Sequence, residues 1–350
     1  MANGRADLQR GAAERTARPQ SDRRSRDRPG LAACPAAGRR PRDGLSGGRP
    51  TMLIHNAEPL TFPACLNPAT VSGLSFEQVA RLAAASGITM IEASIQQVVA
   101  YGPTRAADLL DELGIRVAAA CGLLPDGPVL PHPLLINSPT FVHAVDGLET
   151  RLEVFGAIGC RVATIVLNPR TDLDGPFAHD LAVERLGMLG AACAGHGLTL
   201  AVELVGVQAG LPPSLDGRSP FITGLQGLVQ LLDAVGGGTA AALGVCVDSF
   251  HWAAAGADSA QLTGLVPSRI AHVQVADTST TVPPECWTDE MRLFPGDGAL
   301  PWPKFIHALT DAGYAGPLSV ELFNPSLRRL PDHLIAQRAL SAVTDVQGRP

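Results

Sequence analysis

Short runs of apolar residues alternate along this chain with longer segments of helical periodicity. Four of these runs, between Leu198 and Glu321, are rich in Val, Leu and Ala and are only a few residues long. Such runs are typical of parallel strands that are buried on both faces. The alternation of strand and helix therefore predicts an α/β fold with right-handed helical crossovers between the strands.

The same pattern repeats from about residue 60 to residue 345. The predicted strands are 60–66, 88–93, 115–121, 162–167, 198–205, 244–248, 269–275 and 316–321. The predicted helices are 75–86, 103–113, 139–158, 176–195, 223–235, 258–264, 301–312 and 325–345. Eight strand–helix units in one domain predict a (β/α)8 TIM barrel. A doubly wound open sheet is the alternative, but the glycine-rich turn that normally follows its first strand is missing.

One polar residue with a metal-binding oxygen stands at or near the end of each of the last four predicted strands. These residues are Glu203, Asp248, Gln274 and Glu321. In a closed barrel the carboxyl ends of the strands converge on one mouth, where the chemistry of such folds is located. Three carboxylates and one amide oxygen form a hard ligand set that suits Mg or Mn better than zinc.

The first 51 residues differ from the rest of the chain in composition. They hold 12 Arg and 5 acidic residues, are rich in Pro, Gly and Ala, and show no hydrophobic period. We expect residues 1–51 to be a disordered tail or an upstream extension, with the barrel in residues 52–350 and Met52 as a natural start. An organellar transit peptide and a basic arm for nucleic acid or membrane are the alternatives.

Residues 52–350 are acidic, with 28 acidic against 15 basic side chains. This charge argues against nucleic acid as a partner. The sequence contains no run of eighteen apolar residues, so we expect no membrane span. The seven cysteines include no C-x-x-C pair, which indicates buried, reduced thiols in a cytoplasmic protein. We therefore expect a small-molecule substrate, with homo-oligomer formation left open.

Several motifs in the second half of the chain resemble one known family. They are V-E-L at 202–204, V-D-S-F-H at 247–251, H-V-Q-V-A-D at 272–277, R-L-F-P-G-D-G at 292–298 and G-Y-A-G-P-L-S-V-E-L-F-N at 313–324. Together they resemble the xylose-isomerase-like barrels, the sugar phosphate isomerases and epimerases. Many members carry His where Gln274 stands. Gln at this position is similar to the hydroxypyruvate isomerase and 3-dehydroshikimate dehydratase branches.

The resemblance implies one divalent metal, Mn, Mg or Co, bound by Glu203, Asp248, Gln274 and Glu321. A carboxylate that ends a strand can also be a salt-bridge partner at the barrel rim, and Gln274 can simply satisfy backbone groups. Four such residues at successive strand ends, with matching motifs, favour the metal site.

Four further residues are candidates for contact with a substrate. His251, just past its strand end, is expected to touch substrate or carry a proton, and the resemblance makes Arg292 a substrate-binding cation. His272 and Glu92 are substrate-binding candidates too, but a hydrogen-bonded core histidine and a rim carboxylate are equally good interpretations. Arg292 in turn has the alternative of a solvated loop residue.

The ligand set predicts chemistry next to a carbonyl group. A divalent ion bound to a carbonyl and an adjacent hydroxyl stabilises an enediolate, and Glu203 and Glu321 would remove and return protons. The expected activity is isomerisation or epimerisation of a keto-sugar or hydroxy-carbonyl compound. Loss of a β-hydroxyl, as in a 3-dehydroshikimate dehydratase-type lyase, is the alternative. An abasic-DNA endonuclease is disfavoured by the acidic charge and the scarcity of His, and a non-catalytic sugar-binding barrel stays open.

Overall fold

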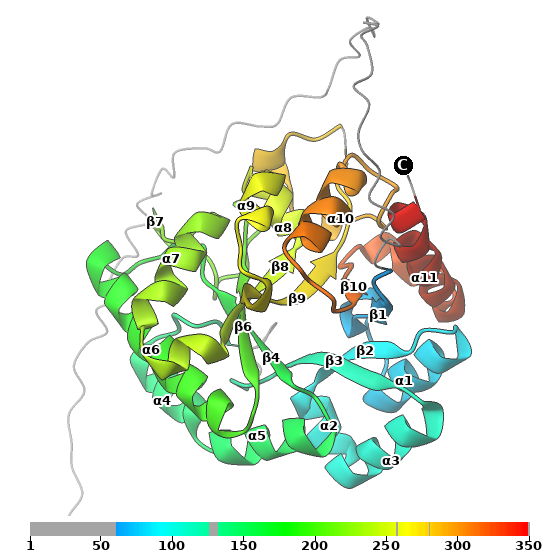
Figure 1. Cartoon of the computed structure of the whole chain (residues 1–350), viewed down its shortest axis with the longest axis horizontal. Helices are drawn as coiled ribbons and strands as arrows, with labels where there is room; N and C mark the ends of the chain where they lie inside the picture. The colour runs from blue at the N-terminus through cyan, green and yellow to red at the C-terminus, as the bar shows by residue number, and fades with distance from the viewer. Residues whose placement is uncertain (1–60, 126–131, 257, 280, 349–350) are drawn as a thin grey trace, which may run out of the picture. The chain divides into compact units, whose positions relative to one another are not determined.

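A computed structural model describes residues 61–348 of the chain except 126–131, 257 and 280. The expected tail, residues 1–51, lies outside the described residues. Eight parallel strands form a closed barrel in the order β1-β10-β9-β8-β6-β4-β3-β2, with helices around it (Figure 1). The predicted TIM barrel is confirmed, and the open-sheet alternative is wrong because β1 pairs with both β2 and β10.

The barrel strands coincide closely with the apolar runs of the sequence. They are β1 Ala64–Leu66, β2 Met90–Ser94, β3 Arg116–Cys121, β4 Val162–Leu167, β6 Thr199–Leu204, β8 Leu243–Asp248, β9 Ile270–Val275 and β10 Leu318–Val320. In β6 and β8, side chains on both faces of the strand are buried, as an all-parallel barrel covered by helices requires. The first and last strands are shorter than predicted.

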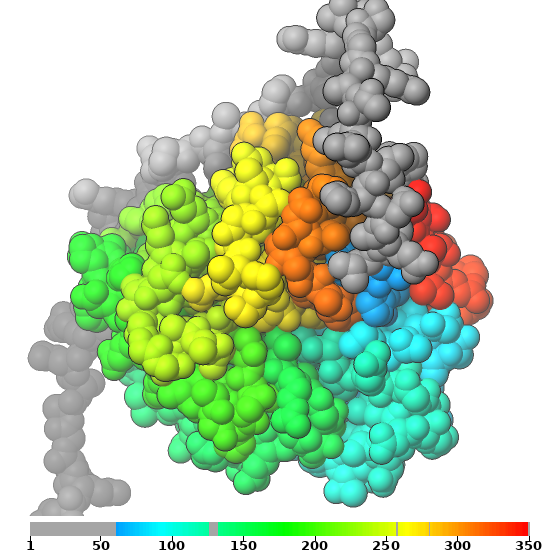
Figure 2. All heavy atoms as spheres, in the orientation of Figure 1, coloured from blue at the N-terminus to red at the C-terminus, as the bar shows by residue number. Residues whose placement is uncertain are grey.

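The helices cover the outside of the barrel. They are α1 Phe76–Ala85, α2 Ile95–Tyr101, α3 Pro103–Leu113, α4 Ser138–Val145, α5 Leu148–Ala157, α6 Gly175–Gly195, α7 Leu225–Val235, α8 Ser249–Ala254, α9 Ser259–Thr263, α10 Trp302–Asp311 and α11 Asp332–Gly348. Ser75 caps α1 as predicted and forms a reciprocal capping box with Gln78. Figure 2 shows the chain colours following one another around the barrel, with the last segment beside the first.

Two helices were not predicted, and two predicted helices are divided. The short helices α2 and α8 begin directly at their strand ends, where the sequence analysis placed loops. The predicted helix 139–158 is broken at Gly147, which has a positive φ of 69°. The predicted helix 325–345 begins as a 3-10 turn, Pro325–Arg329, and α11 starts only after Pro331, because the residue before a proline is disfavoured in the α conformation.

Three loops shape the carboxyl ends of the strands. After β4 and after β6, β5 (Arg170–Thr171) and β7 (Ser219–Pro220) form a small antiparallel pair. After β9, the fully buried Asp277 accepts hydrogen bonds from backbone N–H groups of the loop and from Trp302 Nε1. These bonds fix the loop 277–298, which carries two residues into the barrel mouth.

Two further expectations concern the thiols and the membrane. Four buried cysteines, Cys65, Cys160, Cys193 and Cys246, are free thiols, as the sequence analysis expected. In the part of the chain that the structure describes, every helix is too short or too polar to cross a bilayer.

Candidate active site

Three carboxylates from three strands meet at the barrel mouth. Glu203 lies near the end of β6, Asp248 ends β8, and Glu321 directly follows β10. One carboxylate oxygen of each lies within 4.8 Å of the others. All three side chains are buried, with exposed fractions of 8%, 2% and 8%. The convergence follows from the fold, because parallel strands of a closed barrel end on the same face.

Gln274 lies directly beside this cluster. It is the register partner of Asp248 on the neighbouring strand β9. Its Nε2 donates to Glu321 Oε1 at 3.1 Å, and Glu92 Oε2 lies 3.3 Å from the same nitrogen. Its Oε1 accepts from Cys246 Sγ at 3.3 Å. The four predicted ligands are thus brought together, with the amide nitrogen on the side of the glutamates.

Arg292 is the cation of the site, and it is almost completely buried, with 1% exposed. Its Nη1 lies 2.5 Å from Asp248 Oδ2 and 3.3 Å from Glu321 Oε2. Its Nε and Nη2 donate to Asp289 Oδ1 at 3.0 and 2.9 Å. Arg292 is therefore not the solvated loop residue of the alternative interpretation. Burial lowers the pKa of the guanidinium, but these carboxylates raise it by more, so the net effect is a raised pKa.

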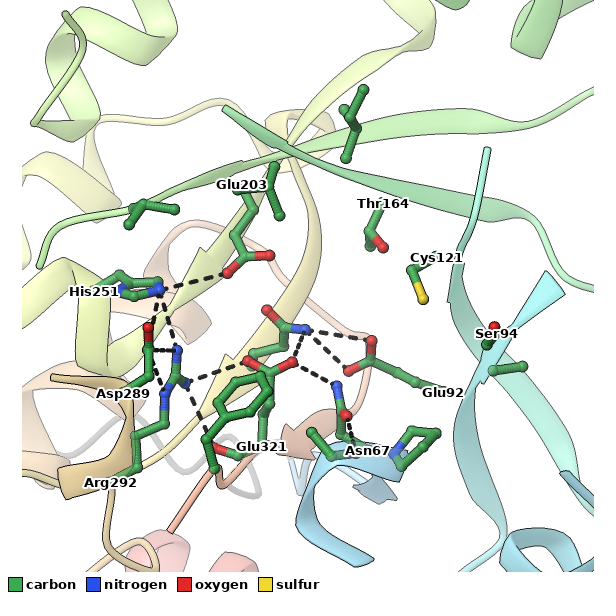
Figure 3. Close-up of a pocket in the computed structure, with 18 of the residues that line it drawn as sticks. Asn67, Glu92, Ser94, Cys121, Thr164, Glu203, His251, Asp289, Arg292 and Glu321 are labelled. Carbon is green, nitrogen blue, oxygen red and sulfur yellow. Dashed lines mark hydrogen bonds and ion pairs between the residues drawn. The ribbon is translucent and has the colours of Figure 1, made fainter. Parts of the chain in front are cut away.

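His251 lies on α8, one turn after Asp248, which caps this helix through hydrogen bonds to Phe250 N and His251 N. The imidazole Nε2 is 3.1 Å from Arg292 Nη2 and 3.7 Å from Glu203 Oε1 (Figure 3). Burial lowers the pKa of His251 below its ordinary value. A neutral imidazole between a glutamate and an arginine can accept or relay a proton.

Glu92 and His272 lie in the barrel interior. Glu92 Oε1 is 3.0 Å from His272 Nε2, although the two groups are not aligned as a hydrogen bond. Burial alone would raise the pKa of Glu92, but the neighbouring His272 outweighs it and pulls the pKa below its ordinary value. Glu92 lines the cavity, while His272 does not. His272 is therefore placed for contact with Glu92 rather than with a substrate.

The pKa values of both glutamates in the cluster are raised, although Arg292 lies beside them. Burial, followed by the charge of Asp248, raises the pKa of Glu203 to about 8. Burial and the charges of Glu203 and Asp248 also raise the pKa of Glu321 well above its ordinary value, against the opposing effect of Arg292. Clustered, buried carboxylates of this kind are stabilised by protons or by a bound cation. The donor set thus fits a hard divalent ion.

A cavity of about 210 Å³ opens beside the cluster. Glu203, Glu321, Arg292 and His251 line one side of it, and Ser94, Cys121 and Thr164 line the other (Figure 3). Leu215 also lines it, so the loop 206–222 reaches the mouth. The volume suits a small molecule.

Two residues of the site were missed in the sequence analysis. Asn67, at the end of β1, donates from Nδ2 to Glu321 Oε1 at 2.9 Å. Asp289 binds Arg292 and lies 3.6 Å from His251 Nε2. The Asn-Pro pair after the first apolar run was an available signal for Asn67. Asp289 lies within a loop, and its local sequence carries no comparable signal.

The chain belongs to the family of xylose isomerase-like TIM barrels, whose family model matches residues 80–345. Among individual proteins, it is similar to a 3-dehydroshikimate dehydratase of Pseudomonas putida, with 27% identity over 53% of this chain and 27% of that protein. It is also similar to an inosose isomerase of Halalkalibacterium halodurans, with 32% identity over 33% of this chain and 38% of that protein.

The matches therefore span well under half the length of these two relatives. A solved structure of the IOLI protein with a bound zinc atom superposes with a TM-score of 0.70 at 20% identity. It covers 81% of this chain and 97% of that one. At this identity the likeness shows the fold alone.

Proposed function

We propose that the protein is a divalent-metal-dependent isomerase or epimerase of a small keto-sugar or related hydroxy-carbonyl compound. The buried cluster of Glu203, Asp248 and Glu321, with oxygens within 4.8 Å of one another beside a small cavity, is the observation that carries the proposal. The family and the inosose isomerase relative support the same class of reaction.

Glu203, Asp248, Glu321 and the amide oxygen of Gln274 would hold the ion. Mn, Mg and Co are the candidates, because the ligands are all oxygens. When bound, a divalent ion polarises a carbonyl oxygen and makes the neighbouring C–H more acidic. Arg292, which already touches Asp248 and Glu321, would remain beside the site and hold these two carboxylates in place.

Glu203 and Glu321 are the groups proposed to remove and return the proton. They come from β6 and β10, which are separated in the barrel by β8 and β9, so they approach a substrate from different sides. Glu321 Oε1 is held by Asn67 and Gln274, whereas Glu203 has a single long contact to His251 at 3.7 Å. The freer Glu203, with His251 behind it, is the better placed to shuttle a proton.

The charges of the cavity favour a neutral substrate. Among the described residues that line it, Arg292 is the one permanent cation, and its donors are occupied by Asp248, Asp289 and Glu321. Four acidic side chains, Glu92, Glu203, Asp289 and Glu321, share the same lining. A phosphate group would be repelled there, so we favour an unphosphorylated polyhydroxy ketone.

A dehydratase of the 3-dehydroshikimate type is the second candidate. The Pseudomonas putida relative favours it, and His251 is placed where it could assist the departure of a hydroxyl. The carboxylate of such a substrate would have to compete for Arg292, which is why we rank it second.

One experiment separates the two candidates. The protein is incubated in D2O with Mn²⁺, Mg²⁺ or Co²⁺ and a panel of ketoses, inososes and 3-dehydroshikimate. An isomerase or epimerase will place deuterium next to the carbonyl of a ketose or inosose, which NMR detects. A dehydratase will instead produce ultraviolet absorbance from a conjugated product. A metal-loaded protein that does neither with any compound contradicts the proposed reaction.

A further inference from the structure

Glu92 has no step in the proposed reaction, yet it lies at the centre of the polar contacts beneath the site. Its side chain is 4% exposed and projects from β2, on the side of the barrel opposite the carboxylate cluster. Its oxygens lie 3.4 and 3.3 Å from Gln274 Nε2, and Oε1 lies 3.0 Å from His272 Nε2. Glu92 thus joins one proposed ligand to a buried histidine.

The two ends of the Gln274 amide are chemically different. Only the oxygen can bind a hard cation, because the amide nitrogen has two hydrogens and no free lone pair for a metal. A glutamine can turn its amide by half a rotation at little cost when nothing distinguishes the two ends. A competent ligand therefore needs a neighbour that selects one orientation.

Glu92 is such a neighbour. An ionised carboxylate only accepts hydrogen bonds, so the amide nitrogen has to face Glu92 and Glu321. The oxygen then faces Cys246 Sγ at 3.3 Å, on the side of β8. This is the strand that ends in Asp248, the register partner of Gln274. The orientation directs the oxygen to the strand that carries the next ligand.

We propose that Glu92 is a positioning residue of the metal site, which fixes the amide orientation of Gln274 so that its oxygen, not its nitrogen, is available to the ion. His272 lies against Glu92 on the other side, with its Nε2 3.0 Å from Glu92 Oε1. The inference rests on the metal binding in the proposed function, but not on the identity of the substrate. It assigns Glu92 and His272 a role other than the substrate contact expected from the sequence.

Metal affinity is the direct test. Glu92→Gln keeps the size of the side chain but lets it donate or accept, so that Glu321 alone is left to select the orientation of Gln274. We expect Mn²⁺ binding to the full chain, measured by calorimetry, to weaken by about 10- to 100-fold, the usual effect of losing a partner of a metal ligand. Glu149→Gln is the matched control. The Glu149 side chain is exposed and does not line the cavity, so this variant should bind Mn²⁺ like the parent protein.

To separate the orientation effect from the effect of the Glu92 charge, Glu92→Gln is also introduced into a Gln274→Glu protein. In Gln274→Glu both ends of the side chain are oxygens, and no orientation has to be selected. Adding Glu92→Gln there should leave Mn²⁺ affinity unchanged or improve it, because no amide orientation remains to be selected and one carboxylate beside residue 274 is neutralised. If Glu92 acts only through its negative charge, the loss will be equal in both backgrounds. Melting curves without metal confirm that each variant is folded.

The outcomes are distinct. Loss in the Gln274 background alone supports the positioning role. Equal loss in both, or no loss in either, overturns it while leaving the metal site intact. A parent protein that binds no Mn²⁺, Mg²⁺ or Co²⁺ overturns the proposed function and this inference with it.

Discussion

The two halves of the barrel mouth differ sharply in chemistry. The half formed by β6, β8, β9 and β10 supplies three carboxylates, Gln274 and the loop with Arg292. The half formed by β1 to β4 lines the cavity mainly with small or neutral side chains such as Ser94, Cys121 and Thr164. Charges and proton-carrying groups thus gather on one side, and the other side mainly shapes the space.

This asymmetry suggests a division of labour. Changes in the charged half should alter turnover and metal affinity, because those residues bind the ion and move protons. Changes in the neutral half should alter which molecule fits, because neutral contacts mainly discriminate by shape. Asn67 and Glu92 are the exceptions, since they come from the first two units and contact the charged half.

The largest effect is expected at Glu321. Glu321→Gln keeps an oxygen that can bind a metal but removes the base, so turnover should fall by about 10²- to 10⁴-fold. Rates are measured on the substrate identified by the D2O panel, with Glu149→Gln as the control. Glu203→Gln should fall similarly, and the two variants should differ in whether deuterium still enters recovered substrate. Near-normal turnover in both would refute the paired-carboxylate mechanism.

Metal removal should destabilise the folded protein. An ion that binds only the folded state at 100 times its Kd stabilises it by about 2.7 kcal/mol. Chelation should therefore lower Tm, and restoring Mn²⁺ should recover it. Asp248→Asn should lose most of this response. An unchanged Tm on chelation, together with no divalent ion in the purified protein, would rule out the metal site.

The metal-free protein should become less stable as pH rises. The pKa of Glu203 is raised from 4.5 to about 8 in the folded state, so between these values the folded chain binds more protons than the unfolded chain. Stability then falls with rising pH, by up to about 1.4 kcal/mol per unit for this group. Melting curves from pH 5 to pH 8 measure the slope. Glu203→Gln should flatten it, and a slope unchanged by this substitution would contradict the assignment.

The smallest effect is expected in the neutral half. Thr164→Val removes one hydroxyl from the cavity lining while keeping the shape of the side chain. KM should change by roughly tenfold at most, with kcat and deuterium exchange retained. A collapse of kcat comparable to that of Glu321→Gln would show that the neutral half takes part in the chemistry, and the contrast between the halves would be wrong.

Local sequence patterns predicted most of the fold because most strands and helices are marked by their own apolar residues and capping residues. The buried strands Val162–Leu167 and Leu243–Asp248 are mostly apolar runs, and Ser75 with Gln78 is a local capping signal. The helices α2 and α8 were missed because each follows its strand with no intervening turn residue. In α8 the cap is Asp248 itself, which the sequence analysis had considered as a metal ligand or a salt-bridge partner at the rim, but not as a helix cap.

By itself, the sequence determined that Glu203, Asp248, Gln274 and Glu321 stand at successive strand ends of a barrel, because hydrophobic period and residue type are local properties. Only the tertiary structure decided what each of them touches. Asn67 and Glu321 lie 254 positions apart, and Gln274 and Glu92 lie 182 apart. Closing the barrel brings the first units against the last, and no local pattern encodes which side chains then share a hydrogen bond. The orientation of the Gln274 amide and the partners of Arg292 therefore came from the closed fold alone.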